Sequence, residues 1–350
     1  MQMMSFSQTE LDQLVALHKS SFMDGDFYID YFIKHKLPNC DCFVEKRDDK
    51  IVSVAYAKKI DIYVGNTLMQ VPFLTGVATD SAYRHQGLAK KLLNESCEHY
   101  KNLGMPFILL HPFNHDFYRK QDYVTVSNMV NINTVKLKTI MHKPIQKLAI
   151  EPLKQTDFLI CLTLYNEFTK NLVGYHKRDN DYYQILFAEH FGDSGKGYLL
   201  LDNGMPFGYL LHDGKNVREL IIPTLVNVEF PPNIILNNAV ISPEIFLQNK
   251  LPVPPLQEHT MGRVGDVFAI LKNAFYNQNF SGTFSFNTNN QSFETTVVNG
   301  RYVKTSLLTD YNPHLPSEKD ILLAFFGNNK SVLLFNNAFT VYNMFILDTY

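Results

Sequence analysis

The chain has 350 residues, of which 45% are hydrophobic and 13% aromatic, and its formal net charge is -2 at pH 7. This length suits two or three domains, and the near-neutral charge provides no global attraction to nucleic acid or to acidic membranes. No apolar run approaches the roughly 18 residues that span a bilayer, and the N-terminus lacks a basic segment followed by an apolar one, so we expect a cytoplasmic protein.

The four cysteines, Cys40, Cys42, Cys97 and Cys161, are too few and too scattered for a disulfide framework. A redox or metal role for Cys40-x-Cys42 is the alternative to free thiols, which we favour. The twelve histidines form neither a His-Glu-x-x-His motif nor a Cys/His cluster. We therefore expect no metal.

The first part of the chain alternates helix-like and strand-like patterns, with short polar turns that favour antiparallel hairpins between the early strands. Its predicted elements are helices over 6–23 and 27–35, strands over 41–44, 50–62 and 67–79, a helix over 88–103, a buried strand over 106–111, a short helix over 117–123 and a strand over 124–132. This order predicts a mixed α/β domain.

A linker over 138–146 precedes a second unit of related design, and the prolines of 252–255 mark a further boundary. The second unit has predicted helices over 151–168 and 181–191, a hairpin over 197–214 and a strand over 217–222. Past the prolines, we predict a helix over 264–272, strands over 282–286, 291–298, 303–307 and 331–335, and a helical turn over 317–326. The glycine-rich segment 192–197 does not match a phosphate loop and is interpreted as a hairpin loop.

The stretch 71–93 joins a strand pattern to a helix pattern through a polar turn that holds Arg84, Gln86 and Gly87. The first amides of a helix lack an acceptor inside it and lie at the positive end of its dipole, so they favour an anion such as phosphate. Gly87 has no side chain to block close approach, and Arg84 adds a permanent cation. We therefore predict an anion site near Leu88. A surface salt bridge is the alternative role of Arg84.

The run from Thr75 to Ala89 resembles the acetyl-CoA-binding motif of GNAT-fold N-acetyltransferases, Arg/Gln-x-x-Gly-x-Gly/Ala, which Arg84, Gly87 and Ala89 match. With the segments 117–123 and 260–267 and the aromatic C-terminus, the whole chain resembles the Eis-like (enhanced intracellular survival) acetyltransferases. His85-Gln86 is a departure, since many relatives carry Arg-Arg there. Pyrophosphate binding is therefore expected to depend on backbone amides and Arg84.

The resemblance implies a mixed α/β protein with a catalytic GNAT domain over 1–140, a degenerate second GNAT-like domain over 141–250 and a sterol-carrier-protein-like (SCP2-like) domain over 251–350. It implies acetyl-CoA as cosubstrate, without a metal, and direct transfer of the acetyl group to a primary amine of an aminoglycoside-like compound, a polyamine or a lysine side chain. Relatives form homo-oligomers, including hexamers. The alternative is a non-catalytic regulatory protein that binds acyl-CoA and lipid.

The amides and side chains around the turn, together with the edge of the preceding strand, are assigned to the cofactor. The cofactor-binding residues are Val77, Ala78, Thr79, Arg84, His85, Gln86, Gly87, Leu88, Ala89 and Asn114. By resemblance, Tyr118 protonates the leaving thiolate, although a core tyrosine is the plainer alternative. The carboxylate of Tyr350 is implied as the base; its ordinary pKa of roughly 3.3 to 3.7 is low for that role unless desolvation raises it.

A wall for the acceptor substrate is expected on the second helix. Phe27 and Tyr31 share a helical face with Tyr28 and Phe32, and Asp26, with neighbouring acidic residues, suits a cationic amine. Ordinary core packing explains the aromatic residues equally well, and a solvated acidic loop explains the carboxylates. We predict Asp26, Phe27 and Tyr31 as the substrate-binding residues.

Overall fold

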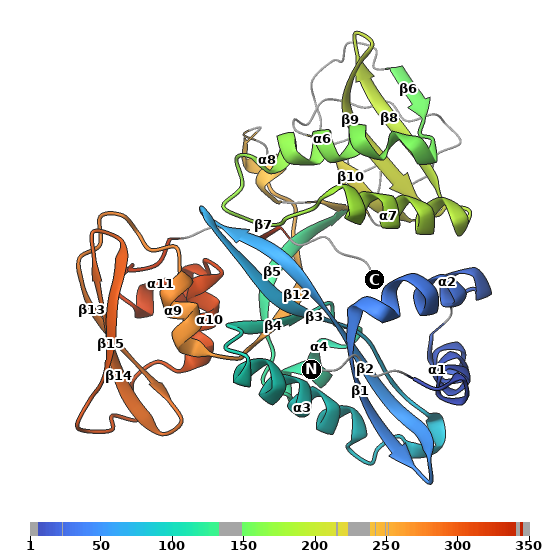
Figure 1. Cartoon of the computed structure of the whole chain (residues 1–350). Coiled ribbons are helices and arrows are strands. Elements are labelled where there is room, and N and C mark those ends of the chain that lie inside the picture. Colours follow the sequence, from blue (N-terminus) through green and yellow to red (C-terminus); the bar gives the residue numbers. More distant parts are fainter. Residues whose placement is uncertain are drawn as a thin grey trace.

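In the computed structural model, the described residues form three β-sheets, each with its own helices. Figure 1 shows the largest sheet in the centre, the second above it and the third on the left. The structure describes residues 6–22, 24–132, 149–214, 216–222, 239–241, 243–248, 250, 252–340 and 344–345. The predicted linker over 138–146 and the predicted base Tyr350 lie outside these residues.

The elements up to residue 132 are interleaved helices and strands that follow the predicted order. They are α1 (Gln8–Ser21), α2 (Asp26–Tyr31), the π-helix η1 (Phe32–Lys36), the short helix η2 (Leu37–Asn39), β1 (Cys40–Arg47), β2 (Lys50–Val64), β3 (Thr67–Thr79), the turn η3 (Ser81–Tyr83), α3 (Leu88–Asn102), β4 (Phe107–Leu110), α4 (His115–Arg119) and β5 (Val124–Ile132). The mixed α/β class is confirmed.

The later elements build two further units and return to the first sheet. They are β6 (Ala149–Pro152), η4 (Gln155–Asp157), α6 (Phe158–Thr169), β7 (Gly174–His176), α7 (Asn180–Gly192), β8 (Lys196–Asp202), β9 (Met205–His212), β10 (Val217–Ile221), β11 (Ala239–Ile241), α8 (Pro243–Gln248), β12 (Leu256–Val264), α9 (Val267–Asn273), β13 (Gly282–Thr288), β14 (Gln291–Val298), β15 (Arg301–Leu307), α10 (Glu318–Phe325), α11 (Asn329–Leu334) and β16 (Met344–Phe345).

The largest sheet recruits strands from all parts of the chain. Its order is β11-β5-β12-β4-β3-β2-β7-β16, and β1 also pairs with β2. β12 runs antiparallel between β4 and β5, and β7 pairs with the far end of β2. The predicted domain limits at 140 and 250 therefore do not coincide with the limits of this sheet, because later strands complete it.

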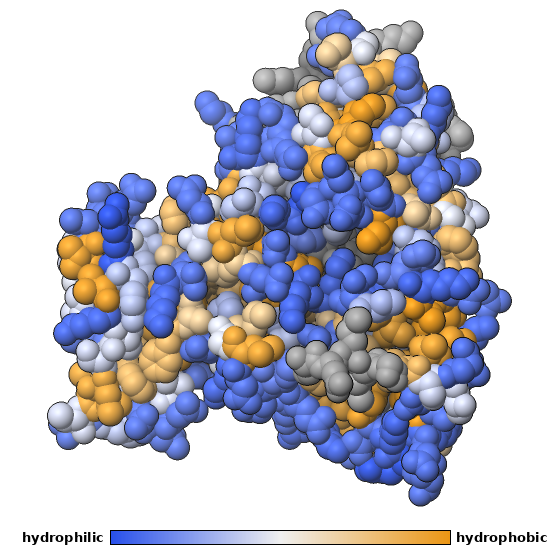
Figure 2. All heavy atoms as spheres, viewed as in Figure 1, coloured by the Kyte–Doolittle hydropathy of each residue, from blue (hydrophilic) through white to orange (hydrophobic). Residues whose placement is uncertain are grey.

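Two faces of the sheet are covered by different helices. Adjacent residues of a strand point to opposite faces, and this separates Tyr56 from Ala57 on β2. Tyr56 packs with Leu14 of α1 in one hydrophobic cluster, whereas Ala57 packs with Leu93 of α3 in another. The outward side of α3 is hydrophilic in Figure 2, as expected for an amphipathic helix on a sheet.

The second unit packs α6 and α7 on the sheet β10-β9-β8-β6. A buried ion pair lies in its core, where Nη1 of Arg178 is 2.7 Å from Oε2 of Glu219. The guanidinium carbon of Arg178 lies 4.2 Å from the ring centre of Tyr165, and Tyr209 donates a hydrogen bond to Glu219. A desolvated pair of charges needs such extra partners, because desolvation otherwise cancels much of the attraction.

The second unit joins the first through α2 and α7, which lie side by side in Figure 1. Glu189 of α7 forms ion pairs with Lys36 of η1 and with Arg218 of β10. Lys36 and Glu189 are both buried in this contact. The π-helical turn η1 is a feature that often marks a functional region, and it lies where the two units meet.

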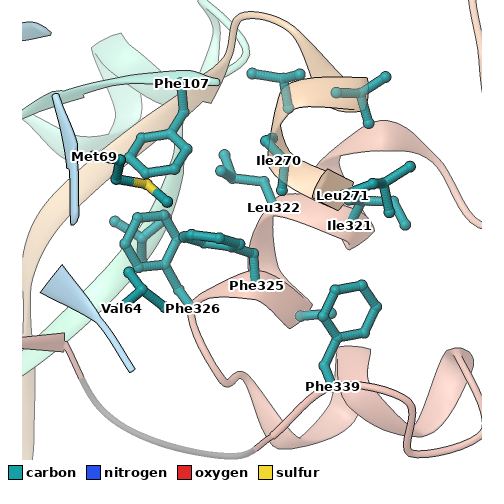
Figure 3. Close-up of a cluster of buried hydrophobic side chains, with 14 of the residues drawn as sticks. Val64, Met69, Phe107, Ile270, Leu271, Ile321, Leu322, Phe325, Phe326 and Phe339 are labelled. Atoms are coloured by element: carbon teal, nitrogen blue, oxygen red, sulfur yellow. The ribbon is translucent and has the colours of Figure 1, made fainter. Parts of the chain in front are cut away.

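The third unit packs α9, α10 and α11 between its own sheet, β13-β14-β15, and the large sheet. Figure 3 shows the contact: Phe325 and Phe326 of the third unit lie against Phe107 of β4, with Met69 and Val64 beside them. The ring of Phe107 is 5.3 Å from that of Phe325 and 5.0 Å from that of Phe326. One hydrophobic core thus holds the third unit to the central sheet.

Some predicted elements were wrong. The predicted strand over 331–335 is helix α11, because Asn328 caps its start by accepting a hydrogen bond from the amide of Ser331. The predicted helix over 264–272 begins only at Val267, after strand β12, which was not predicted. The predicted helix over 27–35 changes from α-helix to π-helix at Phe32.

Removing the ring of Phe107 is expected to destabilise the protein strongly. Phe107→Ala leaves a cavity between the central sheet and the third unit, and such changes cost about 3–5 kcal/mol of unfolding free energy. Denaturant unfolding followed by circular dichroism measures the loss. Leu333→Ala is the control, because Leu333 is 59% exposed and surface changes stay within about 0.5 kcal/mol. Equal losses of unfolding free energy in Phe107→Ala and Leu333→Ala would contradict this account of the contact.

Candidate functional site

A cavity of about 820 Å³ lies where β3 leads through the turn into α3. Its walls come from the end of α1, the last residues of β3, the turn, the first turn of α3 and the region of α4. The lining residues are Ser21, Phe22, Val77, Ala78, Thr79, Tyr83, Arg84, His85, Gly87, Leu88, Ala89, Lys90, Phe113, Phe117 and Gln121. Most of the predicted cofactor residues therefore face one cavity.

The start of α3 has the features of an anion site. Gly87 is the N-cap residue, with φ 78°, and makes no side-chain cap. A side chain at this position would meet nothing within 4 Å, so the space in front of the helix is open. The first intrahelical hydrogen bond is donated by Lys91 to Gly87, which leaves the amides of Leu88 and Ala89 ahead of the helical ladder. No acidic residue occupies the first turn.

Local contacts hold the turn between β3 and α3. Nε of Arg84 donates to the carbonyl of Thr79 at 3.2 Å. Asp80 accepts from the amide of Ala82 at 3.0 Å and pairs with Lys50 at 2.8 Å, which keeps the pKa of its carboxyl below the usual value. His85 adopts φ 62°, a left-handed conformation that is uncommon outside glycine. The turn is therefore stabilised in a conformation that presents its backbone to the cavity.

The end of β3 has one edge without a strand partner in the described part of the chain. β3 pairs with β4 only at Phe73 and Leu74, whereas its pairing with β2 continues to Thr79. The pairing with β2 shifts register opposite Gly76, whose φ of 61° and closeness to the ring of Tyr56 exclude a side chain: a Cβ there would lie 2.7 Å from that ring. This bulge re-aims the backbone of 75–79.

A smaller cavity of about 180 Å³ adjoins the first. Phe22, Val77 and Phe113 line both cavities. The other residues around the small cavity are Phe73, Leu74, Thr75, Gly76, His111 and Tyr118. The small cavity therefore contains the unpaired end of β3 together with two side chains that can transfer protons.

Tyr118 is positioned by α4 and by the aromatic residues around it. The side chain of Asn114 accepts from the amide of Phe117 at 3.0 Å and so caps α4. The Tyr118 ring lies 5.7 Å from each of the rings of Phe113 and Tyr123. Burial raises the pKa of Tyr118 to about 12. Among the residues that the structure describes, no group hydrogen-bonds its hydroxyl, so the hydroxyl is available to a ligand in the small cavity.

His111 was not predicted as a site residue. It follows β4 directly, and its ring lies 4.9 Å from that of Phe73 and 4.3 Å from that of His259 on β12. Nδ1 of His111 lies 3.4 Å from the hydroxyl of Thr260. Burial, together with the neighbouring histidines, lowers the pKa of His259 to about 3, so this second imidazole is neutral at physiological pH. The sequence signal that could have identified His111 is its place at the carboxyl end of the predicted buried strand over 106–111.

The predicted residues separate into two places. Of the cofactor set, Gln86 and Asn114 are not among the residues that line the large cavity, and Asn114 serves as the cap of α4. Asp26 pairs with Lys19 at 2.7 Å, and the hydroxyl of Tyr31 donates to the carbonyl of Ile185 at 3.1 Å. The predicted substrate residues thus lie on α2, with Tyr31 contacting α7, and not around either cavity.

A third cavity, of about 330 Å³, lies between η1, β2 and the second unit. Thr75 lines both this cavity and the small one. Charged side chains of both signs surround it, among them Lys36, Lys59, Asp61 and Asp179. This cavity therefore borders β3 at Thr75.

The described residues contain neither a metal site nor a membrane-spanning helix. No group of three or more His, Cys, Asp or Glu side chains there is arranged to hold a metal ion. Within the same residues, every helix is too short or too polar to cross a membrane.

Comparison with known proteins gives a family for the first part of the chain. Residues 3–126 match the model of the acetyltransferase (GNAT) domain, and no curated protein matches the chain. These residues include every residue that lines the large and small cavities.

Solved structures share the fold of nearly the whole chain. A GCN5-related N-acetyltransferase from Anabaena variabilis ATCC 29413 is 16% identical, with a TM-score of 0.72 and 98% of each chain covered. A probable N-acyltransferase from Enterococcus faecalis V583 is 12% identical, with a TM-score of 0.74 and 99% and 98% covered. Eis1 from Mycobacterium abscessus is 12% identical, with a TM-score of 0.70 and 98% of each chain covered. Residues 3–126 thus match an acetyltransferase (GNAT) domain, and nearly the whole chain shares the fold of these solved structures.

Proposed function

We propose that the protein transfers an acetyl group from acetyl-CoA to a primary amine, in the manner of the Eis-like acetyltransferases. The observation that carries this proposal is the junction of two cavities at the end of β3. The larger contains a helix start suited to pyrophosphate, and the smaller contains Tyr118 and His111. An activated acyl group held between them lies beside groups that can exchange protons with it.

The residues of the large cavity fit acetyl-CoA, which supplies the thioester whose C–S bond is broken. The amides of Leu88 and Ala89 and the guanidinium of Arg84 would bind the phosphate groups of this cosubstrate. The unpaired edge of β3 over 75–79 offers backbone donors and acceptors to an extended amide-containing arm, as in strand addition. A backbone amide near the bulge at Gly76 can polarise the thioester carbonyl.

Tyr118 serves as the acid in this proposal. In the overall transfer a C–N bond forms as the C–S bond breaks, the amine nitrogen loses one proton and the sulfur gains one. A pKa of about 12 keeps the Tyr118 hydroxyl protonated at neutral pH, so it can donate to a developing thiolate. Its place in the small cavity, without a competing partner among the described residues, supports this role.

The base is proposed to be the carboxylate of Tyr350. The imidazole of His111 is the competing candidate, since it lines the small cavity with Tyr118. Histidine is the side chain that most often serves as a general base in enzymes. Extension of the chain beyond Tyr350 and the variant His111→Ala distinguish the two candidates.

The acceptor amine is proposed to approach through the cavity between η1, β2 and the second unit, which shares the lining residue Thr75 with the small cavity. An aminoglycoside-like compound, a polyamine or a lysine side chain remains the proposed acceptor. The SCP2-like character of the third unit, the homo-oligomer and the cytoplasmic location also remain predictions.

The decisive experiment incubates the pure protein with acetyl-CoA and a panel of amines, and records the release of free CoA thiol. The panel includes aminoglycosides, polyamines and a lysine peptide. Binding of CoA is measured separately by calorimetry. Failure to bind CoA, together with no thiol release from any amine, would rule out the proposed reaction.

Arg84→Ala is expected to weaken the binding of acetyl-CoA. A hydrogen bond to a charged group contributes about 1.5–3 kcal/mol, so we expect the Kd to rise about 10- to 150-fold. Arg84→Lys keeps the charge but loses the forked donors, so its Kd should lie between those of the wild type and of Arg84→Ala. Calorimetric titration with CoA gives the values, and Arg301→Ala on β15 is the distant control. A Kd unaffected by Arg84→Ala would remove Arg84 from the phosphate site.

Tyr118→Phe is expected to lower kcat by about 10²- to 10⁴-fold, the usual contribution of general acid catalysis, while the Kd for CoA stays the same. The control is Tyr123→Phe, because Tyr123 is equally buried and lines neither cavity. Since the pKa of Tyr118 is about 12, its hydroxyl should stay protonated up to about pH 10, and its deprotonation should not lower the wild-type rate below that pH. Retention of full kcat by Tyr118→Phe would exclude it as the acid.

Extending the chain beyond Tyr350 is expected to abolish turnover and leave the affinity for acetyl-CoA intact, because a peptide bond then replaces the proposed basic carboxylate. His111→Ala is assayed in parallel over pH 5 to 9. If the extended protein keeps the wild-type rate and His111→Ala loses turnover, the base is His111 and the role of Tyr350 is discarded.

A further inference from the structure

The cavity through which the acceptor amine is proposed to approach, called the acceptor cavity from here on, is lined by residues of two units. Phe32, His35 and Lys36 belong to η1 of the first unit, whereas Tyr182 and Ile185 belong to α7 of the second. The shape of this cavity therefore depends on how η1 and α7 are held together. The inference that follows rests on the proposed acyl transfer.

Glu189 of α7 is the charged link between η1 and the second unit. Its carboxylate forms an ion pair with Lys36 of η1 and another with Arg218 of β10, at 2.5 Å. Lys36 is only 7% exposed and Glu189 only 4%. Of these three residues, Lys36 lines the acceptor cavity and the other two do not. Glu189 can therefore influence the cavity through Lys36.

Two uncharged contacts hold the same helical segment to α7. A Cβ on Gly192 would lie 2.0 Å from the ring of Phe27, so this ring packs directly on the α7 backbone. The hydroxyl of Tyr31 donates to the carbonyl of Ile185 at 3.1 Å. Helix α2 continues without a break into η1, and Figure 1 shows α2 beside α7. The ion pair of Glu189 thus completes a set of contacts at successive turns of α2 and η1.

The buried ammonium of Lys36 is sensitive to the loss of Glu189. Burial lowers the pKa of Lys36, and its pairing with Glu189 opposes that shift. Removing one partner of a buried ion pair leaves a charge without its compensation, which is strongly unfavourable. Without the carboxylate of Glu189, Lys36 is expected to move toward water or to lose its proton. Either outcome changes the lining of the acceptor cavity.

We propose that Glu189 is a positioning residue for the acceptor amine: through Lys36 it holds η1 against the second unit and so fixes the acceptor cavity. The second unit then serves the reaction by shaping the site of the amine. The large and small cavities, where the CoA thioester is proposed to bind, are lined in the described part of the chain by residues of the first unit alone. Loss of Glu189 should therefore impair use of the amine and leave the binding of CoA unchanged.

The test uses the full-length protein and one amine that it acetylates, and it measures KM for that amine, kcat and the Kd for CoA. Substitutions that contact neither ligand change coupling by a factor of about 2 to 30, so Glu189→Gln should raise the KM for the amine by this factor. The Kd for CoA should stay within about twofold. Glu189→Asp keeps the charge on a shorter side chain, and its KM should lie between those of the wild type and of Glu189→Gln.

A double-substitution cycle shows whether Glu189 acts through Lys36. Lys36→Gln should raise the KM for the amine by itself. If the two residues act as one unit, adding Glu189→Gln to Lys36→Gln should change the KM by less than about twofold, because coupled residues are not additive. A full additional rise of KM in the double variant would contradict a role that acts through Lys36.

Glu167→Gln is the matched control, because Glu167 lies on α6 of the same unit, is paired with Lys170 at the surface and does not line the acceptor cavity. Its KM for the amine should equal that of the wild type. If Glu189→Gln does not fold, Tyr31→Phe replaces it: this variant loses only the hydrogen bond to Ile185 and should raise the KM by about 2- to 10-fold.

The outcomes separate this inference from the proposed function. An unchanged KM for the amine in Glu189→Gln, or in Tyr31→Phe where that variant replaces it, with normal turnover, overturns the inference alone. An equal rise in the KM for the amine and in the Kd for CoA also overturns it, because the role of Glu189 would then be general stability. No thiol release by the wild type with any amine overturns the proposed transferase and this inference together.

Discussion

The short pairing between β3 and β4 is the constraint on which the site depends. The two parallel strands share register only from Phe73 and Leu74 to Leu109 and Leu110, and the strands then separate. Backbone groups must be satisfied by a partner, by water or by a ligand, so the unpaired edge over 75–79 favours an extended ligand. Both cavities border this edge. A longer pairing with β4 would close the space between Val77 and Tyr118.

The central sheet explains how distant parts of the chain meet at this opening. β12 lies between β4 and β5 and places Thr260 and His259 beside His111. The third unit is held to the same sheet by the cluster in Figure 3. The site therefore lies on a scaffold whose rigidity comes from burial of aromatic side chains far from the chemistry, and this is the usual way to hold catalytic groups in register.

Burial shifts the pKa values of Tyr118 and His259, two proton-transfer groups near the small cavity, in opposite directions. It raises the pKa of Tyr118, whose charged form is an anion, and lowers the pKa of His259, whose charged form is a cation. In both cases the neutral form is favoured, because a low-dielectric surrounding penalises charge. A neutral tyrosine is the form that donates a proton, and a neutral imidazole beside His111 does not repel an incoming ammonium group.

The sequence by itself determined the features that depend on near neighbours: the strand and helix around the turn, Arg84 and Gly87 within it, and the amphipathic α3. Asn328 could have corrected the predicted strand over 331–335 as well, since a cap is a local signal. Only the tertiary structure decided that Phe22 and His111 face the same cavity and that Phe27 packs against the second unit, where its ring covers Gly192. The physical reason is that helical spacing shows which residues share a face, whereas sheet pairing and packing determine what that face contacts.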